Sequence, residues 1–361
     1  MLKRFSRKAA VLFTAAFIPL LLASAVYAED PVKVGFVYVG PVGDHGWTYR
    51  HDVARQSLEK ELSDKVSTTY VESVAEGADA ERVIRKLASS HDLVFTTSFG
   101  YMNPTVKVAK QFPDVKFEHA TGYKQTENVA TYSGRFYEGR AVIGTIAGLM
   151  TKSNVVGYIA SFPIPEVVRG INAFSIAMRK VNPQAQLKII WVNSWYDPGK
   201  EGDAAKALID QGADILTQHT DSAAPLQVAE QRGVHGFGQA SDMSKFAPKA
   251  QLTAIVDEWS PYYIQKTKGV IDGSWTSGDT WSGIKDGMVV LAPYGEDVPA
   301  DVREAADKVK ASIVDGSWHP FQGPIKNQAG EEVVAEGAVM SDEDLLKMDW
   351  YVEGVQGSLP K

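Results

Sequence analysis

The chain has 361 residues, of which 44% are hydrophobic and 22% charged, and it contains no cysteine. Without cysteine it can form no disulfide, no thiolate metal site and no lipid-modified anchor. Setting aside the four basic residues near the N-terminus leaves 33 Lys and Arg against 44 Asp and Glu; this net charge of −11 disfavours nucleic acid and anionic membranes as partners.

The N-terminal segment, MLKRFSRKAAVLFTAAFIPLLLASAVYAED, has a basic start, an apolar middle and small residues at Val26 and Ala28. This pattern predicts a secretory signal peptide, residues 1–28, that is cleaved after Ala28. A membrane anchor is the weaker interpretation, because a spanning helix needs about 20 unbroken apolar residues and Ser24 interrupts this run. We therefore expect a freely diffusing exported protein, located in the periplasm.

The first half alternates apolar, β-branched runs with amphipathic stretches. Strands are predicted over 32–40, 65–73, 91–100 and 115–122, and helices over 49–62, 79–90 and 103–112. This order demands a parallel sheet that is covered by helices on both faces.

The same pattern then restarts. Helices are predicted over 138–152, 165–181, 203–213 and 224–233, and strands over 154–162, 187–195, 214–220 and 234–241. The mature chain of roughly 330 residues exceeds what one hydrophobic core usually organises. Two similar halves in series therefore predict an α/β protein with two doubly wound, Rossmann-like lobes.

The rest of the chain is too short for a third domain. A strand over 251–259 and a helix over 261–273 are expected to lead the chain back to the first lobe. The similar segments VIDGSW (270–275) and IVDGSW (313–318) each predict a helix end with a C-terminal glycine. A final hairpin-like strand pair is predicted over 320–330. The predicted division is 29–134 plus about 256–290 for the first lobe, and 135–255 plus about 291–361 for the second.

Catalytic signatures are absent from the sequence. It has no G-x-S-x-G, H-E-x-x-H or G-x-x-x-x-G-K-[ST] motif, and GPVGDHG resembles a phosphate loop only loosely. His45 and His51, six residues apart, would not share a helix face, so a zinc pair is not expected. The carboxylates of SDEDLL suit a helix N-terminus. We predict no enzyme, no metal and no cofactor.

In open α/β sheets, ligands bind at the carboxyl ends of the strands. The residues expected there are Asp44, Gly46, Trp47, Thr48, Ser98, Phe99, Gly100, Tyr101, Glu118, His119, Phe162, Pro163, Ile164, Glu166, Asn193, Ser194, Trp195, Tyr196, His219, Thr220, Asp221, Ala240, Ser241 and Asp242. Trp47 and Trp195 occupy equivalent places in the two halves, which suits a flat ligand sandwiched between them, with stacking of about 1 to 3 kcal/mol per base. Flanking carboxylates would accept N–H donors, as a purine requires.

Less specific interpretations stay open for several of these residues. Asp221 and Asp242 could simply cap helices. Four tryptophans are predicted to belong to the core, namely Trp191, Trp275, Trp318 and Trp350, whereas Trp259 and Trp281 fit either role.

Five stretches carry a family resemblance: KVGFVYVGPVGDHGWTYRHDVAR, FPDVKFEHATGY, YSGRFYEGRAVIGTIAGLMTKSNVVGYIASFPIPEVVRGINAF, WVNSWYDPGKEGDAAKALIDQGADILTQHTDSAA and WSGIKDGMVVLAP. The sequence resembles the basic membrane protein family of ABC-transporter substrate-binding proteins, which includes the bacterial purine nucleoside receptor. The likeness runs from about Lys33 to Gly323.

The resemblance implies a periplasmic-binding-protein fold of the first type, with three hinge crossovers and delivery of a small ligand to a membrane permease. The family's stacking aromatics fall on Trp47 and Trp195, its acidic residue on Asp242 and its lysine near the last strand on Lys285. The ligand-binding residues expected overall are Trp47, Thr48, Phe99, Gly100, Glu118, Trp195, Asp221, Asp242 and Lys285. A monomer is expected.

Two departures from the family pattern reduce the number of candidate ligands. Nucleoside-binding members resemble one another in a Phe-Asn pair where this chain has Trp47 and Thr48, and they often carry an anchoring cysteine. Losing the Asn weakens the case for a ribose. Trp47 and the FEHATGY segment resemble the proteobacterial branch of the family that is associated with free purine bases, so a purine nucleobase, with adenine favoured, is the main hypothesis. The alternatives are a purine nucleoside or a flavin, a sensory role beside a membrane receptor, and a periplasmic nucleoside hydrolase.

Overall fold

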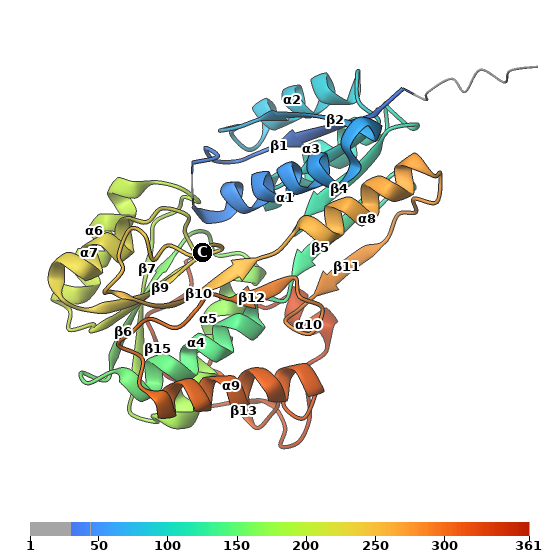
Figure 1. Ribbon diagram of the computed structural model, residues 1–361. Coiled ribbons are helices and arrows are strands. Elements are labelled where there is room, and N and C mark those ends of the chain that lie inside the picture. Colours follow the sequence, from blue (N-terminus) through green and yellow to red (C-terminus); the bar gives the residue numbers. More distant parts are fainter. Residues whose placement is uncertain (1–29, 44, 361) are drawn as a thin grey trace, which may run out of the picture. The chain divides into compact units, whose positions relative to one another are not determined.

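The structure, a computed structural model, describes residues 30–43 and 45–360 (Figure 1). The predicted signal peptide, residues 1–28, lies outside the described residues, and so does Asp44. Within the described ranges, no helix is both long enough and apolar enough to cross a membrane.

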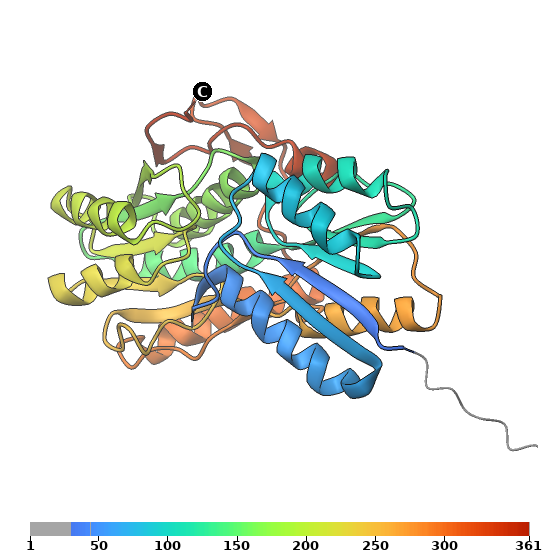
Figure 2. The same cartoon turned by 90° about the horizontal axis from the view of Figure 1, so that it is seen from above.

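The first sheet has six parallel strands in the order β11-β5-β4-β3-β1-β2. Its strands are β1 (Val32–Val37), β2 (Val66–Val71), β3 (Leu93–Thr96), β4 (Lys116–Ala120), β5 (Val129–Gly134) and β11 (Asp279–Ser282). Helices α1 (Gly46–Leu62) and α8 (Ser260–Ile271) pack together on one face, and α2 (Ala78–Ala88) and α3 (Met102–Ala109) on the other (Figures 1 and 2). Because both faces are covered, all four side chains of β3 are buried.

The second sheet has seven strands in the order β12-β10-β9-β8-β6-β7-β15, and only the β10–β12 pair is antiparallel. Its strands are β6 (Val155–Ala160), β7 (Gln186–Trp191), β8 (Ile215–Gln218), β9 (His235–Gly238), β10 (Gln251–Asp257), β12 (Val289–Leu291) and β15 (Val355–Gln356). On one face α4 (Phe136–Met150) packs against α5 (Pro165–Val181) and α9 (Ala300–Asp315). On the other face α6 (Pro198–Asp210) packs against α7 (Ala224–Arg232) (Figure 1). The predicted α/β class with two doubly wound sheets is confirmed.

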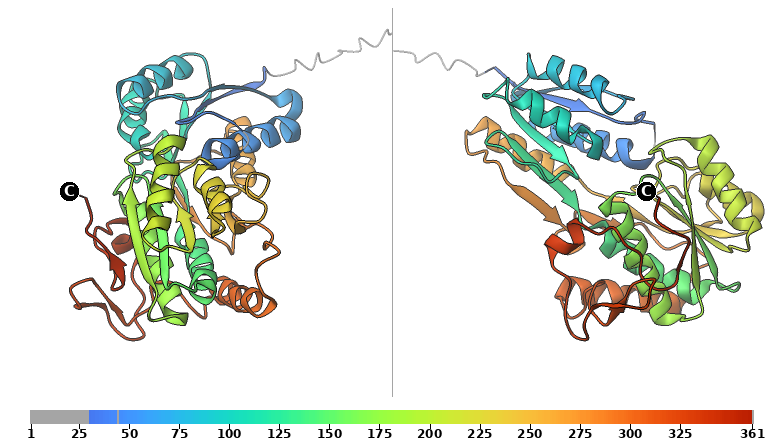
Figure 3. Two further views of the ribbon diagram at one scale, coloured as in Figure 1. Left: turned by 90° about the vertical axis from the view of Figure 1, so that its left-hand side faces the viewer. Right: turned by 180° about the vertical axis from the view of Figure 1, so that it is seen from behind.

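The C-terminal segment lies beside the second sheet (Figure 3). A hairpin-like pair is present as β13 (Ile325–Lys326) and β14 (Glu332–Val334), so its second strand lies beyond the predicted range 320–330. Helix α10 (Asp342–Leu346) then docks on α5. The α5 side chain of Asn172 fixes this segment, because its amide donates to the Trp350 carbonyl at 2.7 Å and accepts from the Val352 N–H at 3.1 Å. Strand β15 then pairs with the edge of β7.

The chain passes between the two sheets three times, after β5, after β10 and after β11. The strand predicted over 251–259 was expected to lead the chain back to the first lobe, but the corresponding strand β10 pairs with β9 of the second sheet. Only α8 and β11 return to the first sheet. The strand predicted over 91–100 ends earlier in the structure, and residues 99–101 form a short 3-10 helix, η2 (Phe99–Tyr101). We keep the predicted lobe boundaries as a proposal, in which each sheet and its helices move about these three passages.

Candidate functional site

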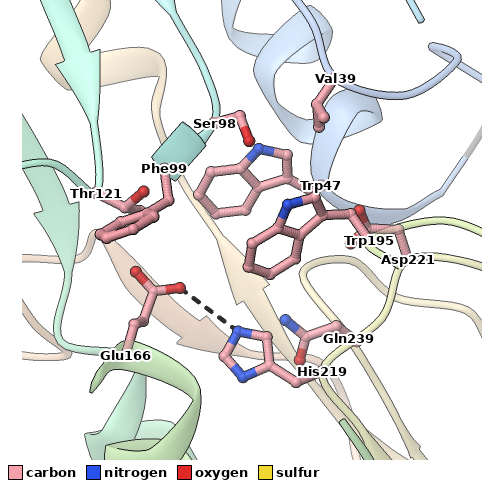
Figure 4. Close-up of a pocket in the computed structure, with 10 residues that line it drawn as sticks. All are labelled: Val39, Trp47, Ser98, Phe99, Thr121, Glu166, Trp195, His219, Asp221 and Gln239. Carbon is pink, nitrogen blue, oxygen red and sulfur yellow. Dashed lines mark ion pairs between the residues drawn. The ribbon is translucent and has the colours of Figure 1, made fainter. Parts of the chain in front are cut away.

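A cavity with about 370 Å³ of empty space, part of it open to solvent, lies where carboxyl ends of the two sheets' strands meet (Figure 4). Residues that follow strands of the first sheet supply one side, and residues that follow strands of the second sheet supply the other. The lining consists of Val39, Trp47, Ser98, Phe99 and Thr121 from the first sheet, and Glu166, Trp195, His219, Asp221 and Gln239 from the second. A mixture of aromatic and polar side chains is typical of small-molecule sites.

Trp47 is a fixed wall of this cavity. It lies in the first turn of α1, and its indole Nε1 donates to the Thr97 carbonyl oxygen at 2.7 Å. The ring meets His51, Trp259 and Phe136 edge to face, with centroids 4.5, 5.5 and 5.9 Å away. Because these partners hold it from behind, the indole is half-buried and oriented without help from a ligand.

Gly46 allows the loop that carries Trp47 to approach the second sheet closely. Its φ of +82° is in the left-handed region, and a Cβ there would lie 2.6 Å from the Asp221 carbonyl oxygen. The Gly46 N–H also donates to Ser241 Oγ at 2.7 Å. A residue with a side chain at position 46 would therefore push the two halves of the site apart.

Trp195 is the aromatic wall that the second sheet contributes. It follows β7, and its ring packs at a tilt against Phe162, with centroids 5.1 Å apart. Its indole Nε1 donates to Glu76 Oε1 of the first-sheet side at 3.2 Å. The Trp195 carbonyl accepts from the Asp221 N–H at 3.0 Å, which ties the two second-sheet loops together.

Polar side chains from the second sheet complete the cavity. His219 Nε2 lies 3.5 Å from Glu166 Oε1, the contact drawn as a dashed line in Figure 4. Burial lowers the pKa of His219, and the hydrogen bond to Glu166 only partly opposes this, so the imidazole is neutral at pH 7. Its Nδ1 is buried and has no hydrogen-bond partner among the described residues. A neutral imidazole leaves one ring nitrogen as a donor and the other as an acceptor.

Asp221 and Gln239 add further hydrogen-bonding groups. Burial raises the pKa of Asp221 well above its usual value; the nearby Glu201 adds to this, and the backbone N–H of Trp47 opposes it. The Gln239 Oε1 accepts from Arg140 Nη2, and Arg140 Nη1 donates to Thr217 Oγ1 at 3.1 Å. The cavity therefore presents both donors and acceptors beside its aromatic faces, which is the chemistry that reads the edge of a heterocycle.

The structure brings four of the predicted ligand-binding residues to the cavity, namely Trp47, Phe99, Trp195 and Asp221. Two others lie directly behind the lining. Thr48 is buried, and its Oγ1 accepts from the Gly40 N–H at 3.2 Å, whereas the Gly100 N–H donates to Glu76 Oε1 at 3.0 Å. Both residues shape the loops that carry the aromatic walls.

The other three predicted residues are placed outside the cavity lining. Glu118 is buried inside the first sheet, where it accepts from Tyr262 and Trp275, and burial raises its pKa against the effect of nearby Lys266. Asp242 accepts from Gln251 Nε2 at 2.7 Å and from the Ser244 N–H at 2.9 Å, as a turn cap does. Lys285 is an exposed residue of the connection between β11 and β12.

Four residues of the site were not among the predicted strand-end residues, namely Val39, Glu76, Thr121 and Gln239. Gln239 is the first residue after β9, and Glu76 belongs to the connection after β2, a strand end that was not searched. Glu166 and His219 were recognised at strand ends but not selected as ligand-binding residues. Reading every strand end, beginning with the first residue after each strand, would have found them all.

His119, the neighbour of Glu118, gives a pH prediction. Burial lowers its pKa to about 3, while the unfolded chain has the ordinary value near 6.5. Below pH 6.5 the unfolded state therefore binds a proton that the folded state does not bind. The free energy of unfolding then falls by about 1.4 kcal/mol for each unit by which the pH is lowered. We expect His119→Gln to abolish about 2 kcal/mol of the loss between pH 6.5 and pH 5.

Urea unfolding of the wild type and of His119→Gln at both pH values measures this difference. The amide of glutamine can keep the contact that His119 Nδ1 makes with Thr96 Oγ1 at 3.0 Å. His91, which is not fully buried, provides the matched control His91→Gln. Equal acid sensitivity of all three proteins would contradict the prediction.

Comparisons with known proteins identify the family to which the chain is similar. A family model described as ABC transporter substrate-binding protein PnrA-like matches residues 31–318. The chain is 58% identical to a purine-binding protein of Brucella abortus (strain 2308), over 94% of this chain and 97% of the relative. It is 38% identical to a putative ABC transporter glucose-binding protein of Haloferax volcanii, over 92% and 82% of the two chains.

A solved structure supports the fold. An ABC transporter solute-binding protein from Aeropyrum pernix K1 has a TM-score of 0.70 and 18% sequence identity, with 88% of this chain and 98% of that chain covered. This likeness confirms the predicted type I periplasmic-binding-protein fold. Since the family match covers most of its length, the chain belongs to the PnrA-like family of ABC transporter substrate-binding proteins, as the sequence resemblance predicted.

Proposed function

We propose that this substrate-binding protein captures a purine nucleobase, with adenine favoured, for an ABC importer. The observation that carries the proposal is the cavity between Trp47 and Trp195, which combines two indoles with a neutral histidine, two carboxyl groups and an amide. The Brucella relative named as a purine-binding protein supports the same ligand class.

The two kinds of lining group have separate tasks in this proposal. The indoles offer flat apolar faces, and base stacking on an aromatic side chain contributes about 1 to 3 kcal/mol. The polar groups of Glu166, His219 and Gln239 offer hydrogen bonds to the ring nitrogens and the exocyclic amine. A ligand that lacks the matching groups would leave these buried side chains without hydrogen-bond partners, so the site discriminates strongly against it.

Capture would follow from movement of the two lobes about the three passages between the sheets. Closure brings the strand ends together over the ligand, and the closed shape is what a membrane permease recognises. The proposal includes export by the predicted signal peptide, action as a monomer in the periplasm and no covalent chemistry. Presentation of the closed complex to a sensory receptor would use the same movement, and a neighbouring permease and ATPase gene pair would favour transport.

A hexose is the second candidate ligand. The Haloferax relative is named as a putative glucose-binding protein, and aromatic faces beside carboxyl groups can also hold a sugar ring. The two indoles favour a flat aromatic ring, because such a ring buries both faces against them. The choice between the two ligand classes can be measured directly.

The test is a thermal-shift and calorimetry panel of adenine, guanine, hypoxanthine, adenosine, riboflavin and glucose. At a concentration one hundred times its Kd, a ligand stabilises the folded state by about 2.7 kcal/mol. We expect adenine to give the largest shift and glucose none. Stabilisation by glucose alone, or by riboflavin alone, would overturn the proposal, and release of free base from adenosine would instead support the hydrolase alternative.

A further inference from the structure

Glu76 links the two sides of the cavity. It lies in the connection between β2 and α2, and its Oε1 accepts three hydrogen bonds: from Ser98 Oγ at 2.5 Å, from the Gly100 N–H at 3.0 Å and from Trp195 Nε1 at 3.2 Å. The first two donors belong to the connection after β3 of the same sheet. The third belongs to the loop after β7 of the second sheet.

The same-sheet donors hold the Glu76 carboxylate in place. A Cβ at Gly100 would lie only 2.2 Å from Glu76 Cδ, so the backbone passes against this carboxylate without room for a side chain. Ser98 and Gly100 need no partner from the second sheet to make their bonds. The acceptor for Trp195 is therefore preorganised, and little conformational entropy is lost when the third bond forms.

The two aromatic walls differ in how they are held. The indole N–H of Trp47 bonds to Thr97 within the first sheet, so this wall is fixed whatever the second sheet does. The indole N–H of Trp195 instead bonds across the cavity, and within its own side Phe162 is the ring partner. Hence the orientation of the second wall depends on the approach of the first sheet.

We propose that Glu76 is a positioning residue that fixes Trp195 over the ligand on closure and thereby prolongs ligand retention. This inference rests on the proposed function, because it takes Trp195 as the second stacking wall. The bond requires the two sheets to lie as close together as they do in this structure, so opening of the cavity breaks it. It therefore slows dissociation and leaves association nearly unchanged, as contacts made late in binding do.

A double-mutant cycle tests the proposal. Release of radiolabelled adenine into excess unlabelled adenine gives the dissociation rate, and equilibrium binding then gives the association rate. Trp195→Phe keeps an aromatic face but lacks the N–H, and Glu76→Ala removes the acceptor. The loss of one such hydrogen bond should raise the dissociation rate by about three- to tenfold in either variant, with association unchanged within about twofold.

The double variant Glu76→Ala/Trp195→Phe should release adenine no faster than the more strongly affected single variant, because both changes remove the same bond. Glu76→Gln keeps an oxygen acceptor and should recover part of the retention. The control is Glu72→Ala, since Glu72 lies after the same strand and accepts from the Val42 N–H at 2.6 Å without reaching Trp195. Its dissociation rate should equal that of the wild type.

Two results would overturn the inference. An unchanged dissociation rate in Glu76→Ala shows that the cross-cavity bond does not retain the ligand. Effects that multiply in the double variant show that Glu76 acts through the Ser98 and Gly100 loop instead of through Trp195. Failure of the wild type to bind adenine contradicts the proposed function separately, and the same cycle then applies to the panel ligand that does bind.

Discussion

Replacing Trp47 with alanine should weaken adenine binding by roughly 5- to 150-fold, the loss that one base-stacking contact of about 1 to 3 kcal/mol implies. The indole is fixed by Thr97 and by the ring of Trp259 before any ligand arrives, so the wild type spends no free energy on ordering it. Titration calorimetry of the variant with adenine measures the loss directly. Trp195→Ala should give an effect of similar size.

Matched variants separate stacking from general damage to the fold. Trp47→Phe keeps a flat face and should bind adenine within about tenfold of the wild type, since a phenyl ring still stacks. Trp318→Ala removes a tryptophan that contacts Lys180 beyond the end of α9, and it should bind normally. Normal adenine binding by Trp47→Ala would mean that Trp47 only fills space between α1 and the core.

The rule that ligands bind at carboxyl strand ends located much of the site from the sequence, and its errors come from where strands stop. The strand predicted over 115–122 ends at Ala120, so Glu118 lies within β4 and its side chain bonds to Tyr262 and Trp275. Thr121, the first residue after β4, lines the cavity instead. A shift of three residues separates a buried structural carboxylate from a side chain that lines the cavity.

The same reasoning explains Asp242. Strand β9 ends at Gly238, so Gln239 is the residue that reaches the cavity, while Asp242 lies three residues further and closes a turn. Sequence patterns place strand ends only to within a few residues, and a side chain reverses direction at each step along a strand. Cavity-lining positions are therefore predictable as short segments but not as single residues.

Two strands of the first sheet could not be recognised from periodicity. Strand β5 follows a polar connection, and β11, with the sequence DTWS, has no apolar run. The position of β11 beside β5 depends on the return of the chain through α8, which is a tertiary event. Long, strongly apolar elements such as α4 and β6 were predictable because their burial is encoded locally.

Trp259 fits two roles in the sequence and is a core residue in the structure. It has no exposed surface, stacks on His51 at 5.0 Å with an interplanar angle of 7°, and meets Trp47 and Tyr132 edge to face, each at 5.5 Å. It begins the passage from β10 to α8, so it joins the second crossing between the sheets to the Trp47 wall. Its removal would affect both stability and the site.

Trp259→Ala should lower the free energy of unfolding by about 3 to 5 kcal/mol, as expected when a fully buried aromatic ring leaves a cavity. Urea unfolding without ligand measures this loss, and Trp318→Ala, a half-buried surface tryptophan, should lose about 1 kcal/mol. Trp259→Phe refills part of the space and should lie between the two. A loss below that of Trp318→Ala would show that the aromatic cluster around Trp47 repacks freely, in which case Trp47 would need a ligand to fix its orientation.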